Sequence, residues 1–106
     1  MKAMSDSVDP VSVELIKGAL QSARSEMEAL IDRTSMSPFI REKKDYFSAF
    51  FDRHGQLISG TRVPLAANLI DCIFAEYPIE TMNDGDLYIY NDPYWSNGAV
   101  SHLPDM

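Results

Sequence analysis

The sequence predicts a small α+β protein, with a long N-terminal helix followed by a β-hairpin, a second helix and a further strand. Three observations indicate this class. Apolar residues recur at helical spacing near the N-terminus, an aromatic-rich run meets a glycine-containing turn within 46–59, and a second helical pattern precedes an alternating aromatic run at 86–90. The 106 residues suffice for one domain with a modest core, and an apolar content of 45% excludes a disordered chain.

The first helix is expected over about 10–33. Asp9 is a good N-cap, and Pro10 suits the first helical position, where no hydrogen bond is lost. Val8 and Val13 stand where a hydrophobic staple would form. One apolar stripe follows, made of Val11, Leu15, Ile16, Ala19, Leu20, Ala23, Met27, Leu30 and Ile31. So long an amphipathic helix in so small a chain predicts packing on a sheet or on another subunit.

A hairpin is expected after an irregular connection over 34–45, where Pro38 disfavours helix at the residue before it. Residues 46–51 predict a strand, 52–55 a turn, and 56–59 the returning strand. The glycine at the fourth turn position favours a type I turn with a bulge.

The second half of the chain predicts one more helix and one more strand. Helical spacing of apolar residues indicates a helix over about 66–77, which Pro78 would end. A turn over 83–85 then leads into a strand over 86–90. That strand delivers the chain into the closing loop, residues 91–105.

The negative charge is confined to the C-terminal part of the sequence. Residues 1–62 hold nine Lys or Arg and nine Asp or Glu, so the whole net charge of -7 falls in residues 63–106, which contain no Lys or Arg. This distribution disfavours nucleic acid and favours cations or a basic partner surface, although a solvated acidic face would look the same. The acidic residues are Asp71, Glu76, Glu80, Asp84, Asp86, Asp92 and Asp105.

The single cysteine and the lack of long apolar runs indicate a cytoplasmic, soluble protein without a membrane partner. Cys72 has no second cysteine to pair with, and its helical context favours a small buried residue over a reactive thiol. No signal peptide pattern is present, and no apolar run approaches the roughly 20 residues that a membrane helix needs.

The closing loop is the candidate site, because a loop that directly follows a strand is anchored by the sheet, and its polar residues are thereby held in position. His102 and Asp105, three residues apart, offer an imidazole and a carboxylate to one divalent cation such as Mn, Zn or Mg. Two ligands are too few, so others must come from elsewhere. In the alternative interpretation, Asn91 and Asp92 only cap a turn and His102 is an ordinary histidine.

Motifs along almost the whole chain carry a resemblance to a known family. They are Asp9 to Ile16 (DPVSVELI), Thr34 to Ser48 (TSMSPFIREKKDYFS), Phe51 to Leu57 (FDRHGQL), Gly85 to Leu87 (GDL), and Asn91 to Tyr94 (NDPY) leading to His102 to Asp105 (HLPD). In these segments the chain resembles the hydantoinase B / oxoprolinase family, which includes the metal-binding large subunit of acetone and acetophenone carboxylases. The motifs occur in order and at plausible spacing.

The resemblance implies a role for the closing loop and for partner proteins. His102 and Asp105 match the family's metal ligands, and a further histidine ligand is implied beyond Met106. The implied cofactor is a divalent metal, Mn or Zn, acting as a Lewis acid. The implied partner is a hydantoinase A-type subunit that binds ATP and phosphorylates the substrate. The subunit that this chain resembles then completes hydrolysis of a cyclic amide or carboxylation of a ketone.

Two departures from the family pattern qualify the resemblance. Many hydantoinase-type members have a short Gly-Gly-Thr before the histidine, whereas residues 95–101 are about three residues longer and look more like the acetophenone carboxylase branch. Family members also continue for several hundred residues. We therefore expect residues 1–106 to be the N-terminal segment of a hydantoinase B-type domain, truncated after the metal-ligand loop and inactive alone.

Other conspicuous residues have simpler interpretations. Arg41, Lys43 and Lys44 could meet phosphate, a carboxylated substrate or an acidic partner, but a solvated cluster is the default. His54 falls in the predicted hairpin turn and is not expected to be a ligand. The strand aromatics are expected in the core, namely Tyr46, Phe47, Phe50, Phe51, Tyr88 and Tyr90.

Two hypotheses of function follow from the sequence. In the first, the chain is an enzyme segment that supplies the metal ligands His102 and Asp105, while Asn91 and Asp92 shape the loop. In the second, it is a non-catalytic interaction module that assembles with a hydantoinase A-type subunit through the long first helix. Metal-dependent turnover of the assembled complex separates them.

Overall fold

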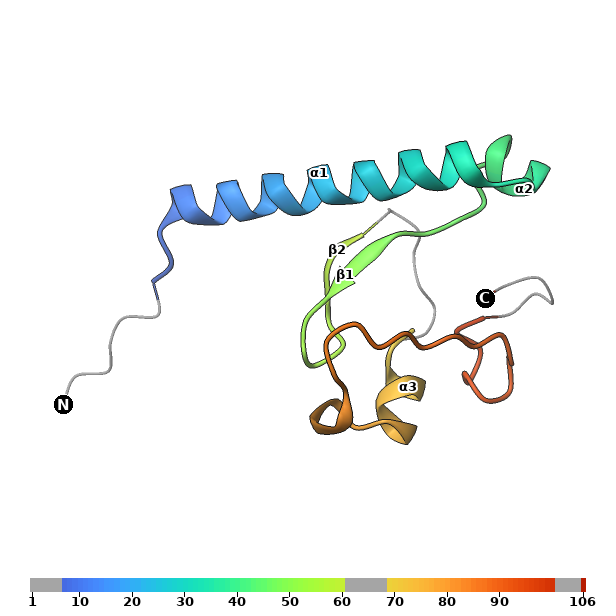
Figure 1. Ribbon diagram of the computed structural model, residues 1–106. Helices are drawn as coiled ribbons and strands as arrows, with labels where there is room; N and C mark the ends of the chain where they lie inside the picture. The colour runs from blue at the N-terminus through green and yellow to red at the C-terminus, as the bar shows by residue number, and fades with distance from the viewer. Residues whose placement is uncertain (1–6, 61–68, 101–105) are drawn as a thin grey trace. The chain divides into compact units, whose positions relative to one another are not determined.

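The computed structural model describes residues 7–60, 69–100 and 106 (Figure 1). Its elements are α1 (Pro10–Thr34), α2 (Pro38–Arg41), β1 (Ala49–Phe51), β2 (Leu57–Gly60), α3 (Asp71–Glu76) and a 3-10 turn, η1 (Ile79–Thr81). They fall into two compact units. The helix–hairpin unit contains residues 1–50 and 57–61, and the C-terminal unit contains residues 51–56 and 62–106. The predicted α+β class is confirmed.

Helix α1 forms where its capping signals predict. The Asp9 carboxylate accepts hydrogen bonds from the Val11 N–H (3.2 Å) and the Ser12 hydroxyl (3.1 Å), so two groups of the first turn are satisfied. The helix ends at Thr34, one residue beyond the predicted end, and the Ser35 N–H closes its last turn on Ile31 O at 2.8 Å. At 1.5 Å per residue, its 25 residues span about 37 Å.

The hairpin turn is held by Asp52. Its carbonyl accepts from the Gly55 N–H (3.0 Å), and its own N–H donates to Gln56 O (2.9 Å). Its Oδ1 also accepts from the N–H groups of His54 (2.8 Å) and Gln56 (2.9 Å). Gly55 has φ +78°, which favours glycine. This arrangement confirms the predicted turn with a bulge at glycine.

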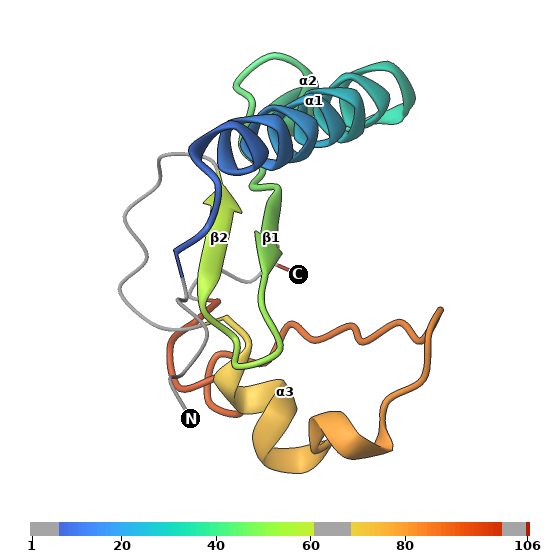
Figure 2. The same cartoon turned by 90° about the vertical axis from the view of Figure 1, so that its left-hand side faces the viewer.

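The first strand of the hairpin is shorter than the sequence predicts, and the second has the predicted length but lies one residue further along the chain. β1 and β2 form a two-stranded sheet and, with only five residues between them, run antiparallel (Figure 2). Residues 46–48 belong to the predicted first strand but lie outside β1. The Ser48 carbonyl, just before β1, accepts a hydrogen bond from Arg24 of α1.

A polar network joins α1 to the hairpin within the helix–hairpin unit. The Arg24 guanidinium donates to Ser48 O and to the Ser59 hydroxyl, both at 3.3 Å. Glu28 Oε1 accepts from the Ser48 hydroxyl (2.6 Å) and from Arg24 (3.4 Å). Because Ser48 is buried, these bonds satisfy groups that would otherwise lack water. The network fixes α1 across one end of the hairpin (Figure 2).

The connection after α1 contains a helical turn that the sequence did not predict. Pro38 begins α2 after Ser37 stays extended at φ -80° and ψ 126°, as the residue before a proline prefers. The chain then reverses at Lys44, which has φ +55°. Lys44 Nζ lies 2.8 Å from Asp32 Oδ2, which lowers the pKa of Asp32 and raises that of Lys44.

In the C-terminal unit, the described part of the second predicted helix is shorter than 66–77. Residues 61–68 lie outside the described residues, and α3 covers Asp71–Glu76. Its end agrees with the prediction, because Tyr77 leaves helical geometry just before Pro78. Gly55 packs closely on this segment: a Cβ there would meet Ile70 at 3.4 Å and Phe74 at 3.5 Å.

The prediction of a strand over residues 86–90 is wrong. The preceding turn forms, with the Asp86 N–H donating to Asn83 O at 3.1 Å and Gly85 at φ +89°. Residues 86–90 then run without β pairing among the described residues. Alternation of aromatic residues is typical of a strand, but a strand also needs a neighbouring strand to pair with, and none pairs with residues 86–90 in the described part of the chain.

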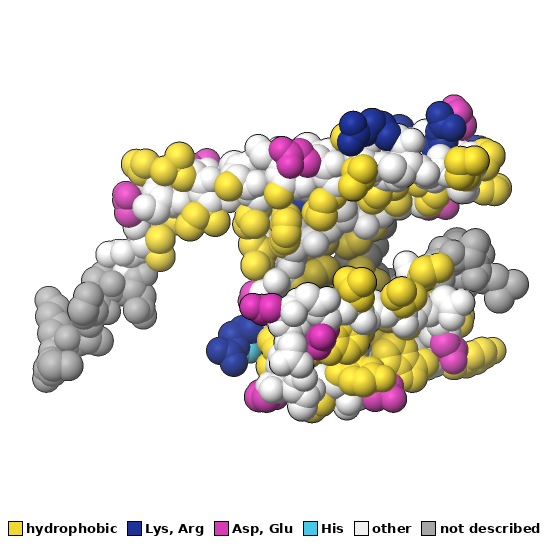
Figure 3. Space-filling view, in the orientation of Figure 1, with side chains coloured by type: hydrophobic (Ala, Val, Ile, Leu, Met, Phe, Trp, Pro, Cys, Tyr) yellow, Lys and Arg dark blue, Asp and Glu magenta, His cyan; other side chains and the backbone are white. Residues whose placement is uncertain are grey.

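The described part of the chain has a very small core. Val100 is its one buried hydrophobic residue, and Ser48 and Ser96 are its buried polar residues. The strand aromatics expected in the core are only half-buried, because two short strands cannot enclose them. Apolar side chains instead cover much of the surface in view (Figure 3). Among the described residues, no helix is both long and apolar enough to cross a membrane.

Candidate functional site

The structure describes the closing loop as far as residue 100, so the two proposed metal ligands, His102 and Asp105, lie outside the described residues. Asn91 and Asp92 lie within them. The geometry on which the candidate site can be built is therefore that of residues 91–100 and of the side chains around them.

Asp92 organises the start of the loop. Its Oδ1 accepts from the N–H groups of Tyr94 (2.9 Å) and Trp95 (3.3 Å), and its carbonyl accepts from the Ser96 N–H (3.0 Å). A carboxylate two residues ahead of a free N–H is well suited to this role, and Pro93 between them fixes φ. The chain therefore turns sharply immediately after residues 91 and 92.

The loop continues as a compact, internally bonded turn. The Gly98 N–H donates to Pro93 O at 2.9 Å, and Asn97 and Gly98 both adopt positive φ, at +53° and +84°. The buried Ser96 hydroxyl donates to Pro93 O (3.4 Å) and accepts from the Val100 N–H (3.3 Å). These bonds give the segment just before His102 a defined path.

A cavity of about 550 Å³ lies beside this turn, within the C-terminal unit. We call it the tyrosine cavity. It is lined by Ile73, Glu76, Tyr77, Leu87, Tyr88, Ile89, Tyr90, Asn91, Asp92 and Trp95. Two tilted ring pairs form part of its wall: Tyr77 with Tyr88, and Tyr90 with Trp95, each with centroids 5.2 Å apart.

Glu76 links α3 to the closing loop inside this cavity. Its Oε2 accepts a hydrogen bond of 2.7 Å from the Trp95 indole N–H. Glu76 and Asp92 are the charged residues that line the cavity, and both are acidic. The cavity wall therefore combines aromatic faces with negative charge and no positive charge.

The surroundings of two cavity tyrosines raise their pKa values further above neutral. Burial, together with the nearby Cys72 thiol, raises the pKa of Tyr90 to about 12, and its hydroxyl donates to Leu69 O at 2.7 Å. Burial and the neighbouring Asp86 carboxylate raise the pKa of Tyr88. Cys72 itself is half-buried, with its Sγ 3.6 Å from Leu69 O. At neutral pH both tyrosines present neutral hydroxyl groups.

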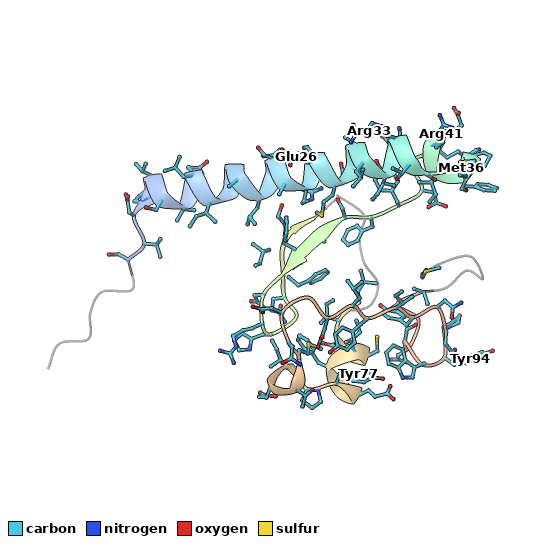
Figure 4. The ribbon with its side chains drawn as sticks, in the orientation of Figure 1. Glu26, Arg33, Met36, Arg41, Tyr77 and Tyr94 are labelled. Carbon is cyan, nitrogen blue, oxygen red and sulfur yellow. The ribbon has the colours of Figure 1, made fainter. Side chains whose placement is uncertain are left out.

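No set of three or more His, Cys, Asp or Glu side chains within residues 7–60 and 69–100 is arranged to hold a metal ion. His54 lies exposed in the hairpin turn. The basic cluster is divided: Lys44 pairs with Asp32, whereas Arg41 is exposed and lies with Arg33 at the C-terminal end of α1 (Figure 4).

Sequence reasoning missed Glu76, Tyr77 and Trp95 as parts of one cavity. Trp95 lies 19 residues after Glu76, and nothing in the spacing indicates that they meet. No local signal marks this contact, because Trp95 is 37% exposed and its indole N–H could equally donate to water.

Comparison with known proteins gives a family match. The model of the family described as hydantoinase B/oxoprolinase matches residues 9–106. A protein proposed to be the B-type component of a D-/L-hydantoinase, from Pseudomonas sp. (strain NS671), is 34% identical over 93% of this chain and 18% of its own length. The caprolactamase β subunit of Pseudomonas jessenii is 30% identical over 94% of this chain and 17% of its own.

The chain covers a still smaller share of a third, less similar relative. The 5-oxoprolinase of Dictyostelium discoideum is 26% identical over 99% of this chain and 8% of its own length. The chain thus spans less than a fifth of each of these relatives. No solved structure matches the chain.

Proposed function

Because the chain belongs to the hydantoinase B/oxoprolinase family, we propose that it is part of a subunit of a multi-subunit enzyme that hydrolyses a cyclic amide. The observation that carries this proposal is the family match over residues 9–106, which includes the whole closing loop. The names of three relatives point to the substrate class, since hydantoin, caprolactam and 5-oxoproline are all cyclic amides.

In this proposal His102 and Asp105 supply two ligands to a divalent metal, Mn or Zn, and the rest of the assembly completes the site. A histidine and a carboxylate suit both ions. The metal would act as a Lewis acid on the substrate carbonyl. The turn organised by Asp92 supports the proposal, because it gives the loop a defined path shortly before these residues.

The partner in this proposal is a hydantoinase A-type subunit that binds ATP. Transfer of the terminal phosphoryl group to the amide oxygen would activate the carbonyl carbon. One water would then add to that carbon and the C–N bond would break, giving an acyl phosphate, and a second water would release phosphate and leave the carboxylate. Use of ATP also fits a cytoplasmic assembly. The longer form of residues 95–101 raises carboxylation of a ketone as a further reaction, so acetone and acetophenone belong among the substrates tested.

Metal analysis of the assembled complex tests the proposal. We expect the complex of the full-length subunit with its ATP-binding partner to contain close to one Mn or Zn per site. The His102→Ala variant should lose that metal and its turnover, because removal of one of few ligands greatly weakens binding. His54→Ala is the matched control and should keep both. Equal metal content in the two variants would contradict the assignment of His102.

A second candidate function, a non-catalytic interaction module, is favoured by the surface of α1. Val11, Leu15 and Ile16 are 66%, 69% and 59% exposed, as expected of a helix that docks on another protein. The same preparation distinguishes the two functions. A stable complex whose turnover is unchanged by metal removal and by His102→Ala would favour the module.

A further inference from the structure

The tyrosine cavity has the chemistry of a site for a positively charged group. Its lining holds two carboxylates, those of Glu76 and Asp92, and no Lys, Arg or His. Residues 63–106 contain no Lys or Arg anywhere, so no basic residue of this segment lies near to neutralise them. The lining of the cavity therefore carries negative charge and no positive charge.

Both carboxylates are held in place by neutral donors. Glu76 accepts from the Trp95 indole, and Asp92 accepts from the N–H groups of Tyr94 and Trp95. Each of these bonds is to one oxygen of its carboxylate, and a carboxylate has further lone pairs with which to accept from a ligand. The acceptors are thus oriented before any ligand arrives.

The aromatic part of the wall adds a second attraction for a cation. Tyr77, Tyr88, Tyr90 and Trp95 all line the cavity, as two tilted pairs. A ring face attracts an ammonium group placed within about 6 Å of its centre. Tyr77 lies at the end of α3 and is 46% exposed, so its ring is accessible at the mouth of the cavity (Figure 4).

The apolar part of the wall indicates that the ligand carries an alkyl chain. Leu87 and Ile89 border the same cavity and are 87% and 77% exposed. An alkyl chain could cover these side chains while its charged end meets the carboxylates. We propose that the tyrosine cavity binds a primary ammonium group carried on an alkyl chain, held by Glu76 and Asp92 and by the faces of the surrounding rings.

This inference rests on the proposed function for the source of the ligand. Hydrolysis of a cyclic amide breaks the C–N bond and forms a C–O bond to the oxygen of water. In a simple lactam such as caprolactam or 5-oxoproline, the nitrogen takes up protons and leaves as a primary ammonium group, while the carbonyl carbon becomes a carboxylate on the same chain. Ring opening of a lactam thus yields the group that the tyrosine cavity suits, a group that the closed ring lacks, whereas ring opening of a hydantoin leaves a neutral carbamoyl nitrogen.

Calorimetric titration of the full 106-residue chain with hexylammonium, hexanol and hexanoate tests the site. We expect hexylammonium to bind about tenfold more tightly than hexanol, because only the ammonium group makes a charged hydrogen bond to the carboxylates. Hexanoate should not bind, because its charge is negative like that of the cavity lining. Glu76→Gln should remove this preference, since the amide keeps an acceptor for Trp95 but loses the charge. Glu80→Gln, which alters an exposed carboxylate outside the cavity, should leave it intact.

A second substitution separates ring attraction from simple apolar contact. Tyr77→Leu should weaken hexylammonium binding about threefold and leave hexanol binding unchanged. Equal affinity for hexylammonium and hexanol, equal losses in Glu76→Gln and Glu80→Gln, or no binding of hexylammonium would each overturn the proposal. The assay needs no metal and no turnover, so its failure is distinct from failure of the His102 metal test.

Discussion

Single aspartates set the path of both well-defined loops. In the hairpin turn, Asp52 accepts from the N–H groups of His54 and Gln56; in the closing loop, Asp92 accepts from those of Tyr94 and Trp95. In each case one side chain accepts from two nearby backbone N–H groups. At Asp52 the donated backbone bonds, with that of Gln56 contributing most, favour the ionised carboxylate and lower its pKa.

The lowered pKa of Asp52 predicts a specific loss of stability in acid. Because the folded-state pKa lies below the usual 3.8, the contribution of Asp52 is present above about pH 4 and is lost as the pH falls through the folded-state value. Asp52→Asn should lower stability at pH 7 and reduce the decline between pH 5 and about pH 2. Acid titration followed by circular dichroism checks this. Asp84→Asn, at an exposed turn position, is the control and should reproduce the wild-type decline.

Among the elements, α1 depends on one polar cluster for its attachment to the hairpin. Arg24, Glu28, Ser48 and Ser59 bond one another at distances from 2.6 to 3.4 Å. The Arg24 and Glu28 side chains are 14% and 27% exposed, so their bonds are partly shielded from water. Apolar contact is limited here, since no residue of α1 is buried. The cluster therefore helps to fix the position of α1 on the hairpin.

Arg24→Gln should destabilise the chain by about 1–3 kcal/mol, because it removes the guanidinium that donates to Ser48 O, to the Ser59 hydroxyl and to Glu28. Urea unfolding followed by circular dichroism measures the loss. Arg33→Gln on the same helix is the matched control, since Arg33 is exposed near the end of α1 (Figure 4), and it should change stability by less than about 0.5 kcal/mol. Similar losses in both variants would show that the cluster contributes little.

The elements that were predicted correctly are those with local signals. Asp9 and Pro10 begin α1, Pro78 follows the end of α3, and Gly55 closes the hairpin turn, each through contacts within a few residues. The strand over 86–90 failed because pairing depends on a distant neighbour that no local pattern specifies. The same distinction applies to the candidate site. The closing loop is predicted as a site from its motif, and that prediction stays untested, whereas the tyrosine cavity depends on the contact of Glu76 with Trp95, which no motif indicates.

At the scale of the whole molecule, charge and apolar surface are both unevenly distributed. All the net negative charge falls in residues 63–106. In the part of the chain that the structure describes, Val100 is the one buried hydrophobic residue. On α1, by contrast, Val11, Leu15 and Ile16 each have more than half of their surface exposed to solvent. Extensive exposed apolar surface is typical of proteins that bind other proteins.

Because the described residues bury little surface, we expect the unfolding free energy of the isolated chain to depend only weakly on urea concentration. The dependence of unfolding free energy on urea scales with the surface exposed on unfolding. We expect a slope at or below about 1 kcal/mol per molar urea, the lower end for small proteins. The measurement is urea unfolding of the isolated chain, followed by circular dichroism. A slope above about 2 kcal/mol per molar would contradict the prediction, because it requires more burial than the described residues show.

Trp95 gives the molecule an intrinsic optical reporter. It is the single tryptophan of the sequence, and its indole N–H is bonded to the Glu76 carboxylate at 2.7 Å. Indole emission is sensitive to a neighbouring charge and to solvent access. The fluorescence of the isolated chain therefore reads out one contact, between α3 and the turn that precedes His102, without any label.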